Sequence, residues 1–393
     1  MSLSGIRVLD LTRVLAGPYC TMMLAELGAN VIKVEDLVGD ELRGTPPMKN
    51  GESGYFFSVN RSKRSIAINL KTEGGKQTVW DLTRQSDVVV LNFGPGVPQR
   101  LGVDYQTLAA INPSIVYCSI TGFGESGPYR DRRAYDPILQ AMSGLMSVTG
   151  PRDGEPVKCG VPVTDIFSGS LGAFSIVTSL YRREKTGQGQ YIELSMLDST
   201  LAMMTMFAGI YFFTGEIPTC LGSEHPLRVP SANYPTSDGR YIHIQVNDRQ
   251  WPKFCELLAT PEMADDPDFN SMAQRVANRD RVNAMISAQL CTKTADEWDK
   301  IFDEAGIPAG PVNTIDRALE NPHVMAREVV KTMFHPNTGP VNAIEMPYRF
   351  AKAGTAIRSA PPQLGEHTNE ILTELLGYSN ERVTQLRAES AIA

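Results

Sequence analysis

The sequence has few of the residues that build metal centres or hydrolytic active sites. Its six cysteines are scattered without a Cys-x-x-Cys pair, and none of its five histidines stands at metal-ligand spacing from another. No Gly-x-Ser-x-Gly motif is present. We therefore expect no metal site, no serine hydrolase and no histidine–zinc enzyme. Scattered free thiols are typical of a reducing compartment and predict a cytoplasmic protein.

Long hydrophobic runs and an excess of basic charge are also missing. The longest apolar run, residues 200–213, is too short to cross a bilayer and predicts a buried core helix. The amino-terminal residues enter a strand-like run almost at once, so we expect no signal peptide. The net charge is −7, without long basic runs, which argues against a general nucleic-acid binder. We expect neither a membrane nor a nucleic acid as a partner.

Strand-like and helix-like segments alternate through the first half of the chain. The strand-like segments are rich in Val and Ile and lie at 6–11, 30–35, 65–70, 87–93 and 113–123. Helical patterns separate some of them, at 19–28 and 71–84. This alternation predicts parallel βαβ units and an α/β fold.

The composition shifts after residue 200. A hairpin is predicted around Asp238-Gly239, and residues 248–328 are mostly short amphipathic helices. Strand-like runs return at 329–336 and 345–350, before a Pro-rich linker and a closing helix. We expect a large domain built from both chain ends, a smaller α+β domain and a linker helix; their bounds are 1–200 with 329–393, 225–328, and 201–224.

The segment 122–127, GFGESG, matches the Gly-x-Gly-x-x-Gly motif of dinucleotide-binding proteins. In that motif a helix begins immediately after the glycines and meets the pyrophosphate. Here Pro128 and a charged stretch follow instead. We interpret these glycines as shaping a loop beside a pocket, which speaks against an NAD-linked oxidoreductase.

Basic residues gather around the strand at 65–70, where the chain has Arg61, Lys63, Arg64 and Lys71. One interpretation is a solvated loop. The other is a group of cations that binds a ligand with several phosphates, since each cation makes charge-assisted hydrogen bonds to phosphate oxygens. The residue types leave both interpretations open.

Asp165 follows an apolar run and precedes a Ser/Gly-rich, helix-like segment. Its structural role would be a helix N-cap. Its catalytic role would be a nucleophile that attacks an activated carbonyl and forms an acyl anhydride. The two roles are compatible, because the positive end of a helix dipole favours an ionised carboxylate. Spacing alone favours the cap.

Ordered segments along essentially the whole chain resemble the class III CoA-transferase family, which also contains α-methylacyl-CoA racemases. The matching segments include GIRVLDLTRVLAGPYC at 5–20, NRSKRSIAINLK at 60–71, GFGESGPYRDRRAYD at 122–136 and DIFSGSLGAF at 165–174. The resemblance implies a Rossmann-like large domain, an interlocked-ring homodimer, and CoA or acyl-CoA as substrate without a prosthetic group.

The resemblance also implies roles for individual residues. It places the catalytic aspartate at Asp165. The residues that it implies for CoA contacts are Leu15, Ala16, Asn69, Lys71, Asn92, Phe93, Arg100, Arg133, Ala134, Tyr135 and Asp136. Candidates to hold the distal carboxylate of a dicarboxylic substrate are Arg13, His225 and Arg228.

The implied reaction moves CoA reversibly between an acyl-CoA, such as succinyl-CoA, and a carboxylic acid acceptor. Asp165 would form an aspartyl anhydride and then an aspartyl-CoA thioester. The chain departs from relatives of this family at Leu15, where formyl-CoA transferase has a glutamine, and at Asp36, which replaces an adenine-side arginine. Tyr135 replaces the histidine of the racemases, which disfavours racemisation. The alternative functions are an acyl-CoA racemase and a non-catalytic CoA-binding protein.

Overall fold

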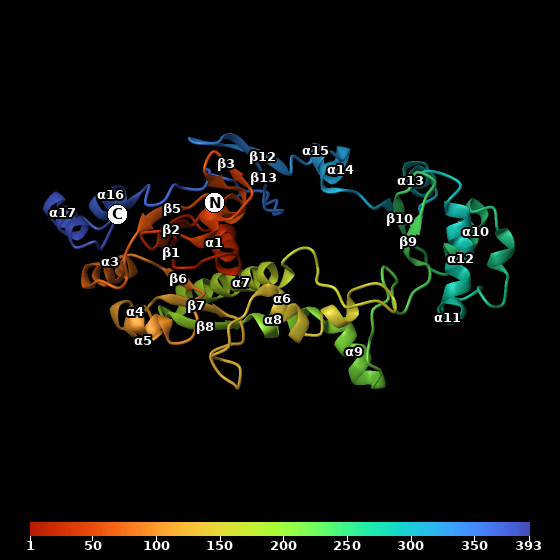
Figure 1. Ribbon diagram of the computed structural model, residues 1–393, viewed down its shortest axis with the longest axis horizontal. Helices are drawn as coiled ribbons and strands as arrows, with labels where there is room; N and C mark the ends of the chain where they lie inside the picture. The colour runs from red at the N-terminus through yellow and green to blue at the C-terminus, as the bar shows by residue number, and fades with distance from the viewer. The chain divides into compact units, whose positions relative to one another are not determined.

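The computed structural model describes residues 1–393, which group into two compact units (Figure 1). The first unit contains residues 1–145, 159–213 and 325–393, and the second contains 146–158 and 214–324. The expected domain bounds stay a prediction. The prediction of a helix spanning 201–224 is wrong, however: α8 (Met196–Met203) and α9 (Thr205–Thr214) end before Gly215, whose φ of 74° is left-handed. The buried core helix predicted at 200–213 is wrong as well, because no residue of α9 is buried.

The first unit is built on a parallel sheet of six strands in the order β5-β2-β1-β6-β7-β8. The strands are β1 (Arg7–Asp10), β2 (Asn30–Glu35), β5 (Arg64–Ala67), β6 (Val88–Leu91), β7 (Val116–Thr121) and β8 (Gln190–Ser195). This is the 3-2-1-4-5-6 order of a doubly wound sheet, whose direction of winding reverses between β1 and β6. The expected α/β fold with a parallel sheet is therefore confirmed.

Alternating side chains of the strands face two separate apolar cores. On one face, Val8, Val90 and Cys118 pack with α1 (Ala16–Glu26) and α7 (Val163–Thr186). On the other face, Leu9 and Leu91 pack with helices that include α3 (Glu73–Arg84), α5 (Tyr105–Ile111) and α17 (Asn380–Ala388). Because both faces are covered, the strands are apolar almost throughout, as the Val- and Ile-rich runs predicted.

Helix α7 has the length and hydropathy of a membrane span, but it packs as a core helix along α1 and against β7 (Figure 1). Small residues allow this close contact. A side-chain carbon on Gly169 would lie 2.5 Å from the carbonyl oxygen of Ala16, and one on Gly172 would lie 3.2 Å from the sulfur of Cys20. The Ser/Gly-rich sequence after Asp165 therefore brings the first turns of α1 and α7 together.

The second unit contains an antiparallel sheet of three strands in the order β11-β10-β9. These are β9 (Ser231–Pro235), β10 (Tyr241–Gln245) and β11 (Ala309–Pro311), and the turn between β9 and β10 contains Asp238-Gly239, as predicted. Helices α10 (Trp251–Leu257), α12 (Arg279–Leu290) and α13 (Ala295–Glu304) complete its core.

A second hairpin follows where the chain returns to the first unit. It pairs β12 (Val330–His335) with β13 (Gly339–Ile344) around the turn that the sequence predicted. The strand expected at 345–350 is wrong, because pairing begins directly at Gly339, whose φ of 71° allows a tight turn. β13 ends at Ile344.

Candidate active site

The loop between β1 and α1 is held by side chains from two other segments. The Asn92 amide accepts a hydrogen bond from the backbone N–H of Arg13 (2.9 Å) and donates one to its carbonyl oxygen (2.8 Å). The ammonium of Lys33 donates to the carbonyl oxygen of Thr12 (2.9 Å). Val14 adopts a φ of 64°, which is strained for a β-branched residue. Such strain persists where the surrounding structure fixes the backbone, as these bonds do.

Two buried ion pairs lie beneath this loop. Lys33 pairs with Asp40 at 2.9 Å and Lys63 with Asp10 at 3.0 Å, and all four side chains are fully buried. Asp10 also accepts hydrogen bonds from Thr12 and Thr21. The carboxylates are therefore compensated, as buried charges must be.

The basic cluster at 61–71 does not act as one group of free cations. Lys63 pairs with Asp10, Arg61 with Glu26 and Arg64 with Glu370. Arg61 and Lys63 are buried, so these two serve the fold. Lys71 is exposed and has no ion pair, which leaves it available to a ligand.

Asp165 lies in the first turn of α7, three residues after the N-cap, Pro162. It is therefore not the cap that spacing favoured. The amino-terminal end of α7 is bonded instead by Asp136, the first residue of α6 (Asp136–Met142). The carboxylate of Asp136 accepts a hydrogen bond from the backbone N–H of Thr164 at 2.8 Å. The other oxygen of Asp136 accepts from the amide of Gln140 at 2.6 Å. The carboxylate of Asp165 has no such partner and stays free for chemistry.

Burial, together with the neighbouring Asp136 carboxylate, raises the pKa of Asp165 to about 7. The helix dipole, which favours the ionised carboxylate, would by itself lower the pKa of Asp165. Desolvation penalises the charged form, and a like charge nearby adds to that penalty. A carboxyl group that titrates near neutral pH is unusual outside functional sites.

Tyr55, at the start of α2 (Gly54–Asn60), is a site residue that the sequence analysis missed. Burial raises its phenol pKa, and so do the charges of Asp165 and Asp136, which places Tyr55 near both. It packs on the apolar cluster that contains Leu15 and Phe56. No motif marks it, since only the packing of α2 beside α1 brings it to Asp165.

A large pocket, with a volume of about 320 Å³, lies beyond the carboxyl ends of β1, β2, β5 and β6. Expected CoA residues Asn69, Lys71 and Phe93 line it. Asn69 also bonds the chain's carboxyl end, because its side-chain amide donates to the carbonyl oxygen of Ser390 at 3.2 Å. Parallel sheets bind nucleotides at this edge, where the strand order reverses.

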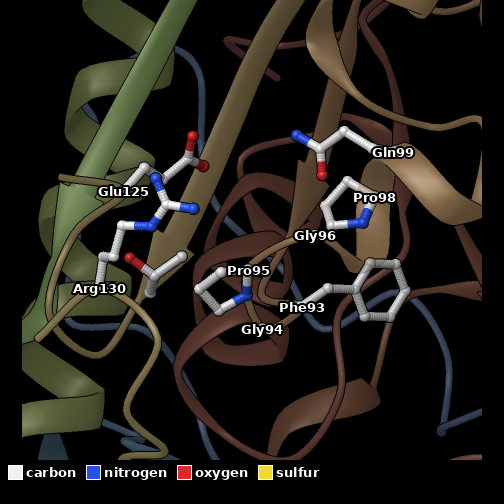
Figure 2. A pocket seen from close by; sticks show the side chains of 9 residues that line it. Phe93, Gly94, Pro95, Gly96, Pro98, Gln99, Glu125 and Arg130 are labelled. Atoms are coloured by element: carbon white, nitrogen blue, oxygen red, sulfur yellow. The ribbon is translucent and has the colours of Figure 1, made fainter.

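A smaller pocket lies on the other side of Phe93, beyond β6 and β7. Figure 2 shows Glu125 and Arg130 on one side of it and Pro98 and Gln99 on the other. The GFGESG loop contributes Glu125, and no helix follows that loop before α6, as the interpretation against a dinucleotide motif predicted.

None of the remaining expected CoA residues lines either of these two pockets, and their role stays a prediction. Leu15 and Ala16 are buried at the start of α1, and Arg100 is exposed on α4 (Val97–Leu101). Arg133 and Tyr135 are exposed just before α6, and Ala134 packs closely against Gly122. Asp136 is buried, and both of its oxygens already accept hydrogen bonds.

The three candidates for a distal carboxylate belong to different units of the chain. Arg13 lines the large pocket with the expected CoA residues. His225 and Arg228 belong to the second unit, where burial, then the charges of Arg228 and Arg279, lower the pKa of His225.

A doubly wound sheet with a pocket where its strand order reverses is the architecture of a nucleotide-binding enzyme. The family follows from comparison: the chain belongs to CoA-transferase family III, whose model matches residues 3–368. It is therefore a family III CoA-transferase, and the family resemblance of its sequence is confirmed.

Individual relatives match over nearly the whole chain. Succinyl-CoA:glutarate CoA-transferase of Mus musculus is 39% identical over 99% of this chain and 90% of its own length. Succinate–glutarate CoA-transferase of Agrobacterium fabrum is 38% identical over 95% of each. The crystal structure of a CAIB/BAIF family protein from Brucella suis has a TM-score of 0.87 at 38% identity, covering 95% of this chain and 99% of that one.

Proposed function

We propose that this CoA-transferase takes succinyl-CoA as its donor and a small dicarboxylic acid as its acceptor. The names of the relatives from Mus musculus and Agrobacterium fabrum, both succinate–glutarate enzymes, support this choice. Glutarate is the first acceptor to test. CoA enters as the acyl-CoA donor and leaves as the acyl-CoA product, and the mechanism needs no prosthetic group.

The mechanism that we propose begins with Asp165. Its ionised carboxylate attacks the thioester carbonyl of succinyl-CoA, and the C–S bond breaks to give an aspartyl–succinyl anhydride and CoA thiolate. The thiolate attacks the aspartyl carbonyl, which releases succinate and leaves an aspartyl-CoA thioester. The acceptor carboxylate then attacks that thioester, and the returning thiolate cleaves the new anhydride to give acceptor-CoA and free Asp165. Each step exchanges one activated acyl bond for another, so no outside energy source is required.

One observation carries this assignment: Asp165 is a partly buried carboxylate with no hydrogen-bond partner and a pKa raised to about 7. A desolvated carboxylate is a stronger nucleophile than a hydrated one, and its surroundings also keep water from the anhydride. Neighbouring Asp136, by contrast, is fully hydrogen-bonded.

The backbone N–H groups of Leu15 and Ala16 are suited to stabilise the oxyanion. Leu15 is the N-cap of α1 and Ala16 is its first residue, and the helix has no side-chain cap, so these two N–H groups donate to no intrahelical acceptor. Preorganised donors of this kind contribute about 3 kcal/mol each to transition-state stabilisation. The N–H of Gly169 is not available for this role, because Gly169 lies inside α7.

The CoA nucleotide would occupy the large pocket, between Lys71 and Phe93. The loop of residues 12–16 links that pocket to Asp165, since Arg13 lines the pocket and Ala16 contacts Gly169 of α7. Arg100 and the exposed Arg133 and Tyr135 would contact the remainder of CoA. Asp136 would act by positioning α7 rather than by contacting CoA.

We also propose the interlocked homodimer. Large apolar side chains are exposed on the outer face of α7 and on α9, among them Phe174 at 70%, Phe212 at 78% and Phe213 at 94%. Exposed apolar surface of this extent marks an interaction site. A cytoplasmic location is supported by six cysteines that are all free thiols.

The racemase alternative requires a second proton-transfer group opposite Asp165. The position that would supply it holds Tyr135, which is 67% exposed. A non-catalytic CoA-binding protein would keep the pocket and would not need an unpartnered, partly buried Asp165. Neither alternative accounts for the site as well as transfer does.

The test compares Asp165→Asn and Asp165→Ala with Asp198→Asn. Asp198 is a matched control, since it occupies the same third position of α8 but is exposed. We expect the Asp165 variants to fold and to lose transfer by at least about a thousandfold, and the control to stay active. Hydroxylamine added during turnover should mark only Asp165 as a hydroxamate in peptide mass spectra. Near-normal turnover by Asp165→Ala would overturn the nucleophile assignment.

The substrates are tested separately. Succinyl-CoA, acetyl-CoA and glutaryl-CoA are each mixed with mono- and dicarboxylic acids, and the acyl-CoA products are identified by mass spectrometry. We expect succinyl-CoA with a dicarboxylic acid to give the fastest exchange. Faster transfer from acetyl-CoA to monocarboxylic acids would reject the proposed substrate class while leaving the family assignment intact.

A further inference from the structure

Arg13 and Asp36 form an ion pair at the rim of the large pocket. Their closest nitrogen–oxygen distance is 3.6 Å, and their side chains are 48% and 41% exposed. Both residues line the pocket. The guanidinium of Arg13 also lies over the ring of Phe93, with its carbon 5.7 Å from the ring centre. Arg13 is thus part of this pocket.

The position of Asp36 matters because it directly follows β2. In doubly wound sheets that bind dinucleotides, an acidic residue at the end of the second strand accepts a hydrogen bond from a ribose hydroxyl, or, where that ribose is phosphorylated, an arginine nearby accommodates the phosphate. Asp36 and Arg13 bring the same two groups to the same place in the fold. The ribose of CoA carries a hydroxyl at C2′ and a phosphate at C3′.

The start of α1 does not reach the large pocket. None of its residues Ala16, Gly17 and Pro18, nor the N-cap Leu15, lines that pocket. An anion in the large pocket must therefore be met by side chains. The cations that line the pocket are Arg13 and Lys71, and Arg13 is the one beside the end of β2.

We propose that Arg13 and Asp36 together recognise the phosphorylated ribose of CoA. Asp36 accepts a hydrogen bond from the 2′-hydroxyl, and Arg13 turns from Asp36 to the 3′-phosphate. Breaking the Arg13–Asp36 ion pair costs little free energy, because a half-exposed ion pair contributes little to stability. The arginine–phosphate contact that replaces it is strong. This inference rests on the proposed function of the pocket as the nucleotide site, and it makes Arg13 a CoA specificity residue rather than a dicarboxylate ligand.

The experiment measures the dissociation constants of CoA and 3′-dephospho-CoA by calorimetry. The proteins are wild type, Arg13→Gln, Asp36→Ala and, as control, Arg84→Gln. Arg84 is 51% exposed and paired with Asp81, outside both pockets. Thermal unfolding checks that each variant folds, which we expect because the altered side chains are exposed.

We expect wild type and the Arg84→Gln control to bind CoA about tenfold more tightly than dephospho-CoA. Arg13→Gln should bind CoA about tenfold more weakly and dephospho-CoA with almost unchanged affinity. This variant would then no longer discriminate between the two ligands. Asp36→Ala should weaken the binding of both ligands by a similar factor, because the hydrogen bond to the ribose is lost.

The outcomes separate this inference from the proposed function. If Arg13→Gln weakens both ligands equally, or weakens neither, the ribose-phosphate assignment is overturned while CoA binding stands. If wild type binds neither ligand, the proposed nucleotide site itself fails.

Discussion

The carboxylate of Asp136 accepts the backbone N–H of Thr164 at 2.8 Å, one residue before Asp165. A single side chain thus bonds the start of α7 and adds negative charge beside the nucleophile that we propose. The same relationship fixes the position of Asp165 and contributes to its raised pKa.

Replacing Asp136 should therefore change the pH dependence of transfer. In the wild type, the rate should fall as the pH drops through about 7, because Asp165 must be ionised to attack and its pKa is raised to about 7. Asp136→Asn keeps an oxygen to accept the Thr164 N–H but removes the charge. We expect its acidic limb to move to lower pH. The check is a profile of kcat/KM from pH 5 to 9, because kcat/KM reports the pKa values of the free enzyme, and an unmoved limb would contradict the coupling.

Asp165 should also make the fold less stable as the pH rises. Its pKa is about 7 in the folded protein, against an ordinary value of 3.8 for an aspartate, so the folded state holds its proton more tightly. Stability is then highest below pH 4 with respect to this group, and it falls as the pH rises to about 7. Asp165→Asn lacks this penalty, which is at most about 4 kcal/mol. Urea unfolding should show that the free energy of unfolding of the variant rises relative to that of the wild type between pH 5 and pH 8. An equal difference at both values would argue against the raised pKa.

Gly169→Ala tests the contact between α1 and α7. The new methyl group would lie 2.5 Å from the carbonyl oxygen of Ala16 and 3.2 Å from the backbone nitrogen of Cys20, so the helices must separate. We expect a loss of about 1–3 kcal/mol in stability and slower transfer, because Ala16 and Asp165 move apart. The neighbouring Ser170→Ala serves as control, since Ser170 bonds only within its own helix, to Ile166. Unfolding and kcat should be measured for both, and a Gly169→Ala variant as active and stable as the control would show that the close contact is dispensable.

Lys63→Met tests whether the basic cluster serves the fold. The substitution would leave Asp10 buried without its ion-pair partner, which costs about 3–5 kcal/mol. Lys71→Met removes an exposed cation and should hardly change stability, but it should raise KM for the acyl-CoA. The measurement pairs urea unfolding with KM for each variant. If Lys63→Met were as stable as the wild type and bound CoA more weakly, Lys63 would be a ligand residue instead.

Much of the first unit could be predicted from local pattern. The Val- and Ile-rich runs became β1, β2, β6 and β7 because strands buried on both faces must be apolar throughout. Gly28 ends α1 with a left-handed φ of 108°, as its place after the helical pattern predicted. The strand at 345–350 failed, since an apolar run cannot show where pairing with β12 begins.

The candidate site was less accessible from the sequence. Tyr55 carries no motif and reaches Asp165 only through the packing of α2 on α1. The basic residues at 61–71 looked alike in sequence, and only their partners separate buried Lys63 from exposed Lys71. Which cation is free depends on contacts with residues far along the chain, and a local pattern does not contain them.

The sequence by itself determined the family and the α/β class, because these follow from ordered residue types along the chain, and it pointed to Asp165 as the nucleophile that we propose. Tertiary structure decided the state of Asp165. Asp136 comes from another helix to bond α7 and, together with burial, raises the pKa of Asp165 to about 7. Local spacing favoured a helix cap for Asp165. The fold gives the capping bond to Asp136 and leaves the carboxylate of Asp165 desolvated and unpartnered, since burial and like-charge repulsion depend on distances in space rather than along the chain.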